Sequence, residues 1–164
     1  MKKFSLIAIC LLVLSVAAPV ARAQGNAKQG PDVVRDPDLE RDSLHNLEVA
    51  RFYFSRLRKA YVSSLQRCEE IDAGNPTFSK IDEVLFIAGE SSLHLASAEG
   101  KQKPSQYVVH DGTEKRTLTA DDFRDKARDY LSQLVNGYPD SKFKDTALED
   151  LKALGGPKLK ESKQ

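Results

Sequence analysis

Cysteine is scarce in this sequence, which limits how the folded chain can be stabilised. Only Cys10 and Cys68 occur, and Cys10 lies in an apolar run that we expect to be removed with a signal peptide. Cys68 is then the sole thiol of the mature chain, so no internal disulfide can form and stability must come from packing. A buried, inert thiol is the favoured interpretation, and a reactive or dimerising Cys68 is the alternative.

Motifs for catalysis and metal binding are also missing. His45, His94 and His110 belong to no H-E-x-x-H or C-x-x-C arrangement, and residues 89–92 lack the G-x-S-x-G frame of a nucleophile elbow. We therefore assign no catalytic residue, no metal ligand and no cofactor. His45 and His94 occupy equivalent positions of the repeat described below. A metal-binding or enzymatic function that uses His45 and His94 is therefore the alternative.

Neither sign of charge dominates. The chain has 25 Lys and Arg against 24 Asp and Glu, a net charge of +1. Removal of residues 1–23 takes away Lys2, Lys3 and Arg22, which leaves 22 minus 24, or −2. A near-neutral protein gives no electrostatic case for binding nucleic acid or anionic membranes.

The longest apolar run lies near the amino end. Lys2 and Lys3 precede the uncharged run 4–16, and residues 21–23 supply a small-x-small cleavage site. Since about 20 residues are needed to span a bilayer, the run predicts a Sec signal peptide, 1–23, cleaved after Ala23. We expect export to the periplasm, no transmembrane segment after cleavage, and a flexible leader over residues 24–35.

Apolar residues recur at helical spacing between residues 36 and 156. Small or apolar residues at offsets of 4 and 7, followed by proline at offset 12, occur twice: from Ser64 to Pro76 and from Ala127 to Pro139. This spacing is that of the second half of a tetratricopeptide repeat. We therefore predict an all-α domain of tetratricopeptide-like antiparallel helix pairs, with about five helices, followed by a disordered tail at 157–164.

The two prolines are 139 minus 76, or 63, residues apart, which exceeds the period of about 34 residues. An insertion at 100–119 accounts for the excess. Asp111-Gly112 between β-prone runs is a hairpin signal, but an isolated hairpin is marginal in water. We expect a mobile loop that could contact a partner, with the hairpin as the alternative.

Local signals predict several helix ends and one close contact. Asp36 followed by proline predicts an N-cap, and Thr119 with Asp122 predicts a capping box. Gly89 has no turn residues around it, so we interpret it as a close-packing position between helices. Gly137 is expected to end a helix in the left-handed conformation.

The segment 138–148 resembles the inter-repeat turn of the BamD-like outer-membrane assembly lipoproteins, in which Tyr-Pro-x-Ser precedes an aromatic residue and an Ala-Leu helix start. Residues 75–78 are similar to a degraded copy of this turn. The resemblance implies a periplasmic tetratricopeptide-like scaffold that binds partner proteins of the cell envelope. The structural turn residues would be Tyr138, Pro139, Ser141, Phe143 and Pro76.

Two departures separate the chain from that family. Its members are lipid-anchored through an N-terminal Cys that this mature chain lacks, and they carry about twice as many repeats. Periplasmic coordinators of the Tol-Pal type share the same turn, so such a role is the alternative within the envelope class.

In stacked helix pairs, the first helix of each pair faces a concave surface on which partner segments bind. Two Phe residues amid charges at these positions suit a protein interface. The alternative is that both are core residues in a slightly shifted register. The candidate protein-binding residues are His45, Glu48, Phe52, Ser55 and Arg56 in the first helix and Glu83, Phe86, Glu90, Leu93 and His94 in the third.

Overall fold

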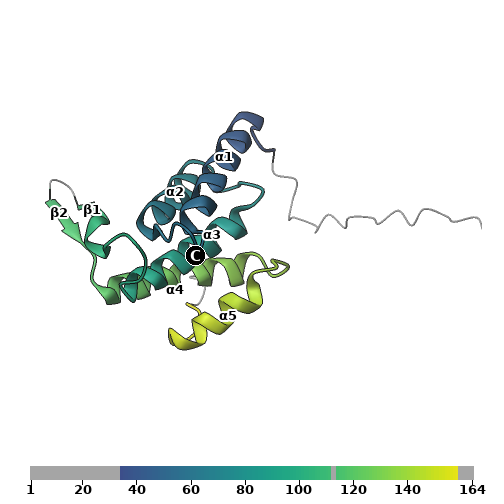
Figure 1. The fold of residues 1–164 in the computed structure, drawn as a ribbon. Coiled ribbons are helices and arrows are strands. Elements are labelled where there is room, and N and C mark those ends of the chain that lie inside the picture. Colours follow the sequence, from purple (N-terminus) through teal and green to yellow (C-terminus); the bar gives the residue numbers. More distant parts are fainter. Residues whose placement is uncertain (1–33, 112–113, 159–164) are drawn as a thin grey trace, which may run out of the picture.

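The structure is a computed structural model that describes residues 34–111 and 114–158. The predicted signal peptide and residues 24–33 of the predicted leader lie outside this range. The all-α class is confirmed, with five α-helices and one small hairpin in the described residues (Figure 1). The elements are α1 (Pro37–Phe54), α2 (Tyr61–Gly74), α3 (Ile81–Ala96), the short 3-10 helix η1 (Pro104–Gln106), β1 (Val108–Asp111), β2 (Glu114–Thr117), α4 (Ala120–Gly137) and α5 (Lys144–Ala153).

Both predicted N-terminal caps form. The Asp36 carboxylate accepts the N–H of Asp38 and Leu39 at the start of α1. Thr119 and Asp122 exchange the two hydrogen bonds of a capping box at the start of α4. These caps are recognisable from the sequence because they satisfy backbone donors that every helix start leaves open.

The expected left-handed cap at Gly137 is wrong. Positive φ angles occur at Gly100, Gly155 and Gly156, but not at Gly137. Instead, α4 is closed by an ordinary helical bond, in which the N–H of Tyr138 donates to the Leu134 carbonyl at 2.8 Å. The chain then leaves the helix at Tyr138, whose φ is −130°.

The turns of α2–α3 and α4–α5 share one backbone geometry. Three N–H to carbonyl bonds recur at an offset of 138 minus 75, or 63, residues, with N···O distances of 2.7, 3.0 and 3.1 Å in the first turn and 2.8, 3.0 and 3.1 Å in the second. The bonds run from Asn75 to Ile71, Phe78 to Asn75 and Ile81 to Phe78, and from Tyr138 to Leu134, Ser141 to Tyr138 and Lys144 to Ser141. The two turns therefore share one pattern of backbone hydrogen bonds.

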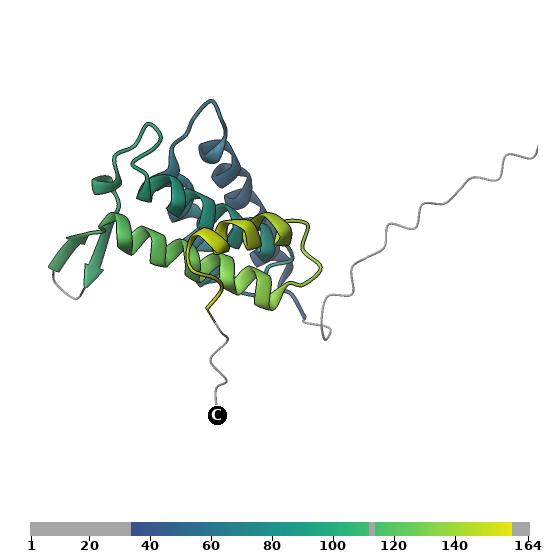
Figure 2. The same ribbon diagram turned by 90° about the horizontal axis from the view of Figure 1, so that it is seen from below.

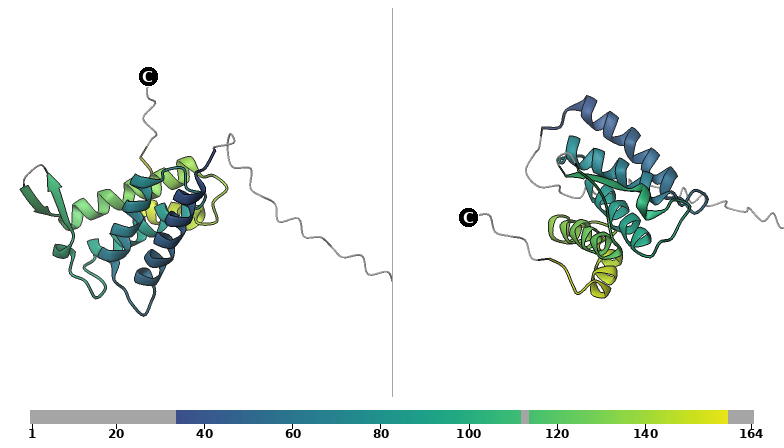
Figure 3. Two further views of the ribbon diagram at one scale, coloured as in Figure 1. Left: turned by 90° about the horizontal axis from the view of Figure 1, so that it is seen from above. Right: turned by 90° about the vertical axis from the view of Figure 1, so that its left-hand side faces the viewer.

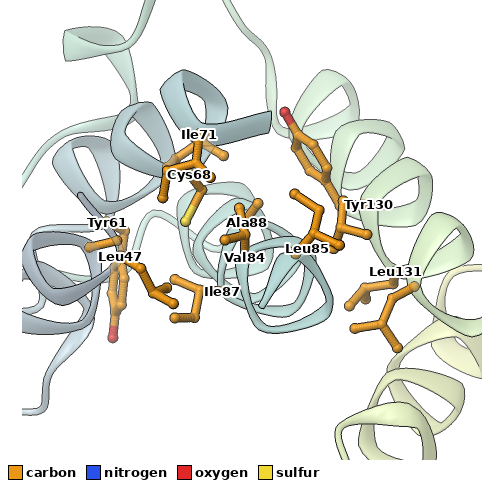
Figure 4. Close-up of a cluster of buried hydrophobic side chains, with 14 of the residues drawn as sticks. Leu47, Tyr61, Cys68, Ile71, Val84, Leu85, Ile87, Ala88, Tyr130 and Leu131 are labelled. Atoms are coloured by element: carbon orange, nitrogen blue, oxygen red, sulfur yellow. The ribbon is translucent and has the colours of Figure 1, made fainter. Parts of the chain in front are cut away.

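α3 lies at the centre of the core, between α2 and α4 (Figure 4). α1 packs on α2 and also contacts α3, and α5 packs on α4. The predicted close approach at Gly89 is confirmed, because a Cβ there would stand 2.6 Å from Cδ2 of Leu131 on α4. Leu131 is fully buried, and so are Leu47 of α1 and Leu65 of α2. The core thus joins all of α1 to α4 through α3.

The predicted turn residues hold the second unit against α3. The Ser141 hydroxyl donates to Oδ2 of Asp82 on α3 at 2.7 Å, and its oxygen accepts the N–H of Phe143 at 3.3 Å. Pro139 is exposed, as is Pro76 in the first turn, and Tyr138 is half-buried. Ser141 therefore fixes the turn to α3, and the two exposed prolines restrict the backbone of each turn.

The insertion contains a hairpin rather than the expected mobile loop. Strands β1 and β2 pair antiparallel, with Val108 opposite Thr117 and His110 opposite Lys115. The hairpin projects beyond the helices (Figures 1 and 2). Its support is Tyr107, just before β1, whose buried ring meets Phe123 of α4 edge-on at 5.6 Å. This anchor supplies the tertiary contact that an isolated hairpin lacks.

The segments before α1 and after α5 form hydrogen bonds with the rest of the helical region. Arg35, in the predicted flexible leader, donates to the Thr77 carbonyl at 2.9 Å. At the other end, the N–H of Lys158 donates to the Ser132 hydroxyl at 2.9 Å, and Asn136 donates to the Lys158 carbonyl at 2.9 Å. Lys158 is therefore held along α4, although the sequence assigned it to a disordered tail. The rest of that tail, 159–164, lies outside the described residues.

Candidate functional site

The α1 half of the predicted groove is open to solvent. His45, Glu48, Phe52 and Arg56 are all exposed, and Ser55 is partly buried. Phe52 keeps 51% of its surface accessible, and the Arg58 guanidinium lies 4.6 Å from the centre of its ring. An exposed aromatic side chain held under a cation is a pre-formed contact point.

The α3 half is occupied by contacts within the protein. Phe86 stacks on Phe143, with ring centres 4.6 Å apart, and both are half-buried. Leu93 packs against the core. Phe86, one of the two candidate aromatic anchors, thus lies under the turn before α5. This position agrees with the alternative prediction, in which Phe86 is a core residue. Only Phe52 is left as an exposed anchor.

A two-pronged ion pair joins α1 to α3. Nε and Nη2 of Arg51 donate to the two carboxylate oxygens of Glu83 at 2.6 and 2.7 Å. Burial acts to raise the pKa of Glu83, but the hydrogen bonds and the charge of Arg51 outweigh it and hold that pKa below its ordinary value. Glu83, a candidate groove residue, is therefore engaged inside the protein.

The structure does not bring His45 and His94 together. The His94 ring stacks on Tyr61 at 4.1 Å and lies 6.0 Å from Phe54, and its Nδ1 is 2.7 Å from Oε2 of Glu99. His45 lies nine residues before Phe54 on α1, about 13 Å along the helix axis. Across residues 34–111 and 114–158, no three His, Cys, Asp or Glu side chains form a group that could hold a metal ion.

Glu90 faces a second carboxyl group across the α3–α5 contact. Oε1 of Glu90 and Oδ2 of Asp150 are both buried, and neither has a hydrogen-bond donor in the described part of the chain. Burial, then the hydrogen bond to Asp150 and its charge, raise the pKa of Glu90 to about 8. This raised pKa favours the protonated form of Glu90 at neutral pH.

A polar cluster around Glu69 of α2 was not predicted from the sequence. Its carboxylate accepts Lys126 Nζ at 2.6 Å, the Tyr107 hydroxyl at 2.7 and 2.9 Å, and the Tyr130 hydroxyl at 3.1 Å. Lys126 also lies 5.5 and 5.4 Å from the two tyrosine rings. Burial, with the charge of Glu69, raises the pKa of both tyrosines, so their hydroxyls stay protonated as donors. The cluster connects α2, α4 and the base of the hairpin.

We expect Glu69→Gln to lower the free energy of unfolding by about 1–2 kcal/mol. The amide keeps an acceptor but loses the charge that balances Lys126, and hydrogen bonds to charged groups contribute more than neutral ones. Urea unfolding monitored by circular dichroism measures the change. Glu70→Gln is the matched control, because Glu70 is exposed and, among residues 34–111 and 114–158, forms an ion pair with its helix neighbour Arg67 alone. Equal effects of the two substitutions would contradict a structural role for the cluster.

Cys68 is 1% exposed and free. Burial, with the nearby charge of Glu69, raises the pKa of its thiol. Since the thiolate is the reactive form, this environment favours the inert interpretation over the reactive one.

Comparison of the chain with protein-family models, curated proteins and solved structures found no match. Within the described residues, no helix is long and apolar enough to cross a membrane. The candidate site is the open face of α1 around Phe52, which keeps half of its surface exposed.

Proposed function

We propose that the protein is a non-catalytic scaffold of the cell envelope that binds partner proteins, and that its helices form a tetratricopeptide-like stack. The recurrence of one helix-turn-helix unit supports the stack, since the same backbone bonds recur 63 residues apart. The contact of α1 with α3, in addition to that of each helix with the next, is the neighbour order that stacked pairs require.

The observation that carries a binding role is the exposed stripe of α1. Leu44, Glu48 and Phe52 are spaced four residues apart, so they lie along one side of the helix. All three are exposed. An aromatic anchor beside an aliphatic side chain, with charge between them, has the composition of a protein-binding surface.

The proposed place of action is the periplasm, and outer-membrane assembly is the proposed process. The predicted signal peptide supports the first, and the likeness of segment 138–148 to the BamD-like turn supports the second. In this proposal the α3 positions brace the stack from inside, and α1 contacts the partner.

We expect Phe52→Ala to reduce capture of partner proteins from envelope extract by at least about 30-fold, the effect of removing an interface hot spot. The readout is a pulldown with the chain from Gln24 onward, followed by identification of the captured proteins. Leu39→Ala is the matched control, because Leu39 is 46% exposed on another face of the same helix. Unchanged capture by Phe52→Ala, or an equal loss in both variants, would contradict the assignment of the α1 face.

A further inference from the structure

The loop between α1 and α2 presents an apolar side chain among cations. Leu57 is 84% exposed, and its neighbours Arg56, Arg58 and Lys59 are exposed as well. Lys101 joins them from the segment after α3, where its Nζ donates to the Leu57 carbonyl at 2.7 Å. We call these five residues the basic tip.

The four cations of the basic tip have no acidic partner in the part of the chain that the structure describes. None of them lies within 4 Å of a carboxylate in the described residues, whereas Arg51, Arg67, Arg116 and Lys126 all form ion pairs. The nearby Glu99 is bonded to His94 instead. A chain whose net charge is only +1 thus concentrates uncompensated positive charge at one end of its helices.

The conformation of the basic tip is fixed by a second segment. Lys59 has a φ of +47°, which a residue with a side chain rarely adopts. Its carbonyl accepts the N–H of Lys101 at 2.9 Å. Gly100 lies against the same carbonyl, and a Cβ at Gly100 would stand 2.6 Å from it. The α1–α2 loop and the segment after α3 project side by side from one end of the helices (Figures 2 and 3).

We propose that the basic tip docks the protein onto an anionic lipid surface. Leu57 enters the boundary between headgroups and acyl chains, and Arg56, Arg58, Lys59 and Lys101 contact lipid phosphates. A protruding turn cannot enclose a peptide, but it presents Leu57 and the exposed cations beside it to a flat anionic surface. Apolar burial together with cations beside anionic headgroups is the combination that holds peripheral proteins on membranes. The net charge of the whole chain does not indicate membrane binding, because it sums these clustered cations with the acidic residues elsewhere in the chain.

Binding to vesicles tests the proposal without any partner protein. The chain from Gln24 onward, which retains all the described helices and strands, is sedimented with vesicles of phosphatidylcholine alone or mixed with phosphatidylglycerol. We expect binding to the anionic vesicles only, and its loss near 1 M salt, where the screening length falls to about 3 Å.

The decisive variant is Arg56→Gln/Lys59→Asn, since asparagine tolerates the left-handed conformation at position 59. Each cation near an anionic membrane strengthens binding by about five-fold, so we expect a loss of about 25-fold. Lys115→Gln/Lys152→Gln removes the same charge from exposed positions outside the basic tip and should bind like the parent. Leu57→Ser should weaken binding while keeping its salt dependence.

Three results would overturn the proposal. The first is absence of binding to anionic vesicles, and the second is an equal loss in the two charge variants. The third is capture of an acidic peptide such as polyglutamate, dependent on Arg56 and Lys59, without vesicle binding, which would assign the basic tip to an acidic protein segment. Partner capture through Phe52 is measured separately, so failure of either proposal leaves the other testable.

Discussion

Leu131→Ala is expected to lower the free energy of unfolding by about 3 kcal/mol, because Leu131 is fully buried between α3 and α4. Gly89→Ala is expected to lower the free energy of unfolding by about 1–3 kcal/mol, because the added methyl group would overpack the core. A Cβ at Gly89 would stand 2.6 and 2.7 Å from Cδ2 and Cγ of Leu131, and these distances require Leu131 to move within a closed core.

The two substitutions should compensate when combined. Leu131→Ala removes the atoms that a Cβ at Gly89 would meet. The loss of unfolding free energy in the double variant should therefore be smaller than the sum of the two single losses, by about 1 kcal/mol or more. Urea or thermal unfolding of the four proteins completes the cycle. Leu134→Ala with Gly89→Ala is the control, since Leu134 is equally buried on α4 but provides none of the nearest contacts to Gly89. Additive effects for Gly89 and Leu131 would contradict close packing of α3 on α4.

The features predicted correctly from the sequence depend on neighbours along the chain. The caps at Asp36 and Thr119 satisfy donors two or three residues away. Gly89 was identified by the absence of turn residues around it together with its place in a helical stripe. All the residues that make up such a signal lie within one helix or directly beside it, so the signal can be recognised in a single sequence.

The features missed depend on residues far apart. Arg51 of α1 pairs with Glu83 of α3 across 32 residues. Glu69 meets Tyr107, Lys126 and Tyr130 across 38, 57 and 61 residues. No spacing rule connects such positions, because their proximity follows from how the helices stack.

The hairpin and the groove were misjudged for a related reason. Local physics makes a two-stranded hairpin marginal, and the contact that stabilises this one, Tyr107 on Phe123, lies outside its strands. The repeat register assigned Phe86 and Glu90 to the groove face of α3. It could not indicate that the α5 unit brings Phe143 and Asp150 onto that same face. The open surface is therefore smaller than the repeat pattern alone implies.

Glu90→Gln is expected to stabilise the protein at alkaline pH. Glu90 is held against Asp150 with buried oxygens that have no donor in the described residues. Burial, then the hydrogen bond and the charge of Asp150, raise the pKa of Glu90 to about 8 from its ordinary value of 4.5. A glutamine side chain can donate its N–H to the Asp150 carboxylate at any pH, so it supplies the bond without the proton.

The sign of the pH dependence follows from proton linkage. Between about pH 4.5 and pH 8 the folded protein keeps a proton on Glu90 that the unfolded chain has released. The free energy of unfolding therefore falls as pH rises through this window and levels off above it. Glu90 is only partly buried, so solvent screening makes the effect smaller than the full pKa shift implies. We expect Glu90→Gln to be more stable than the parent by roughly 1–2 kcal/mol at pH 8.

Urea unfolding at several pH values separates this effect from other titrations. The difference between Glu90→Gln and the parent should shrink as pH falls from 8 to 5, because the parent then regains the proton on Glu90. Glu149→Gln, an exposed change beside Asp150 on α5, should follow the parent at every pH. If the curves of Glu90→Gln and the parent run parallel, Glu90 does not keep its proton up to alkaline pH. The contacts of α3 with the turn before α5 are then the stacking of Phe86 on Phe143 and the bond from Ser141 to Asp82.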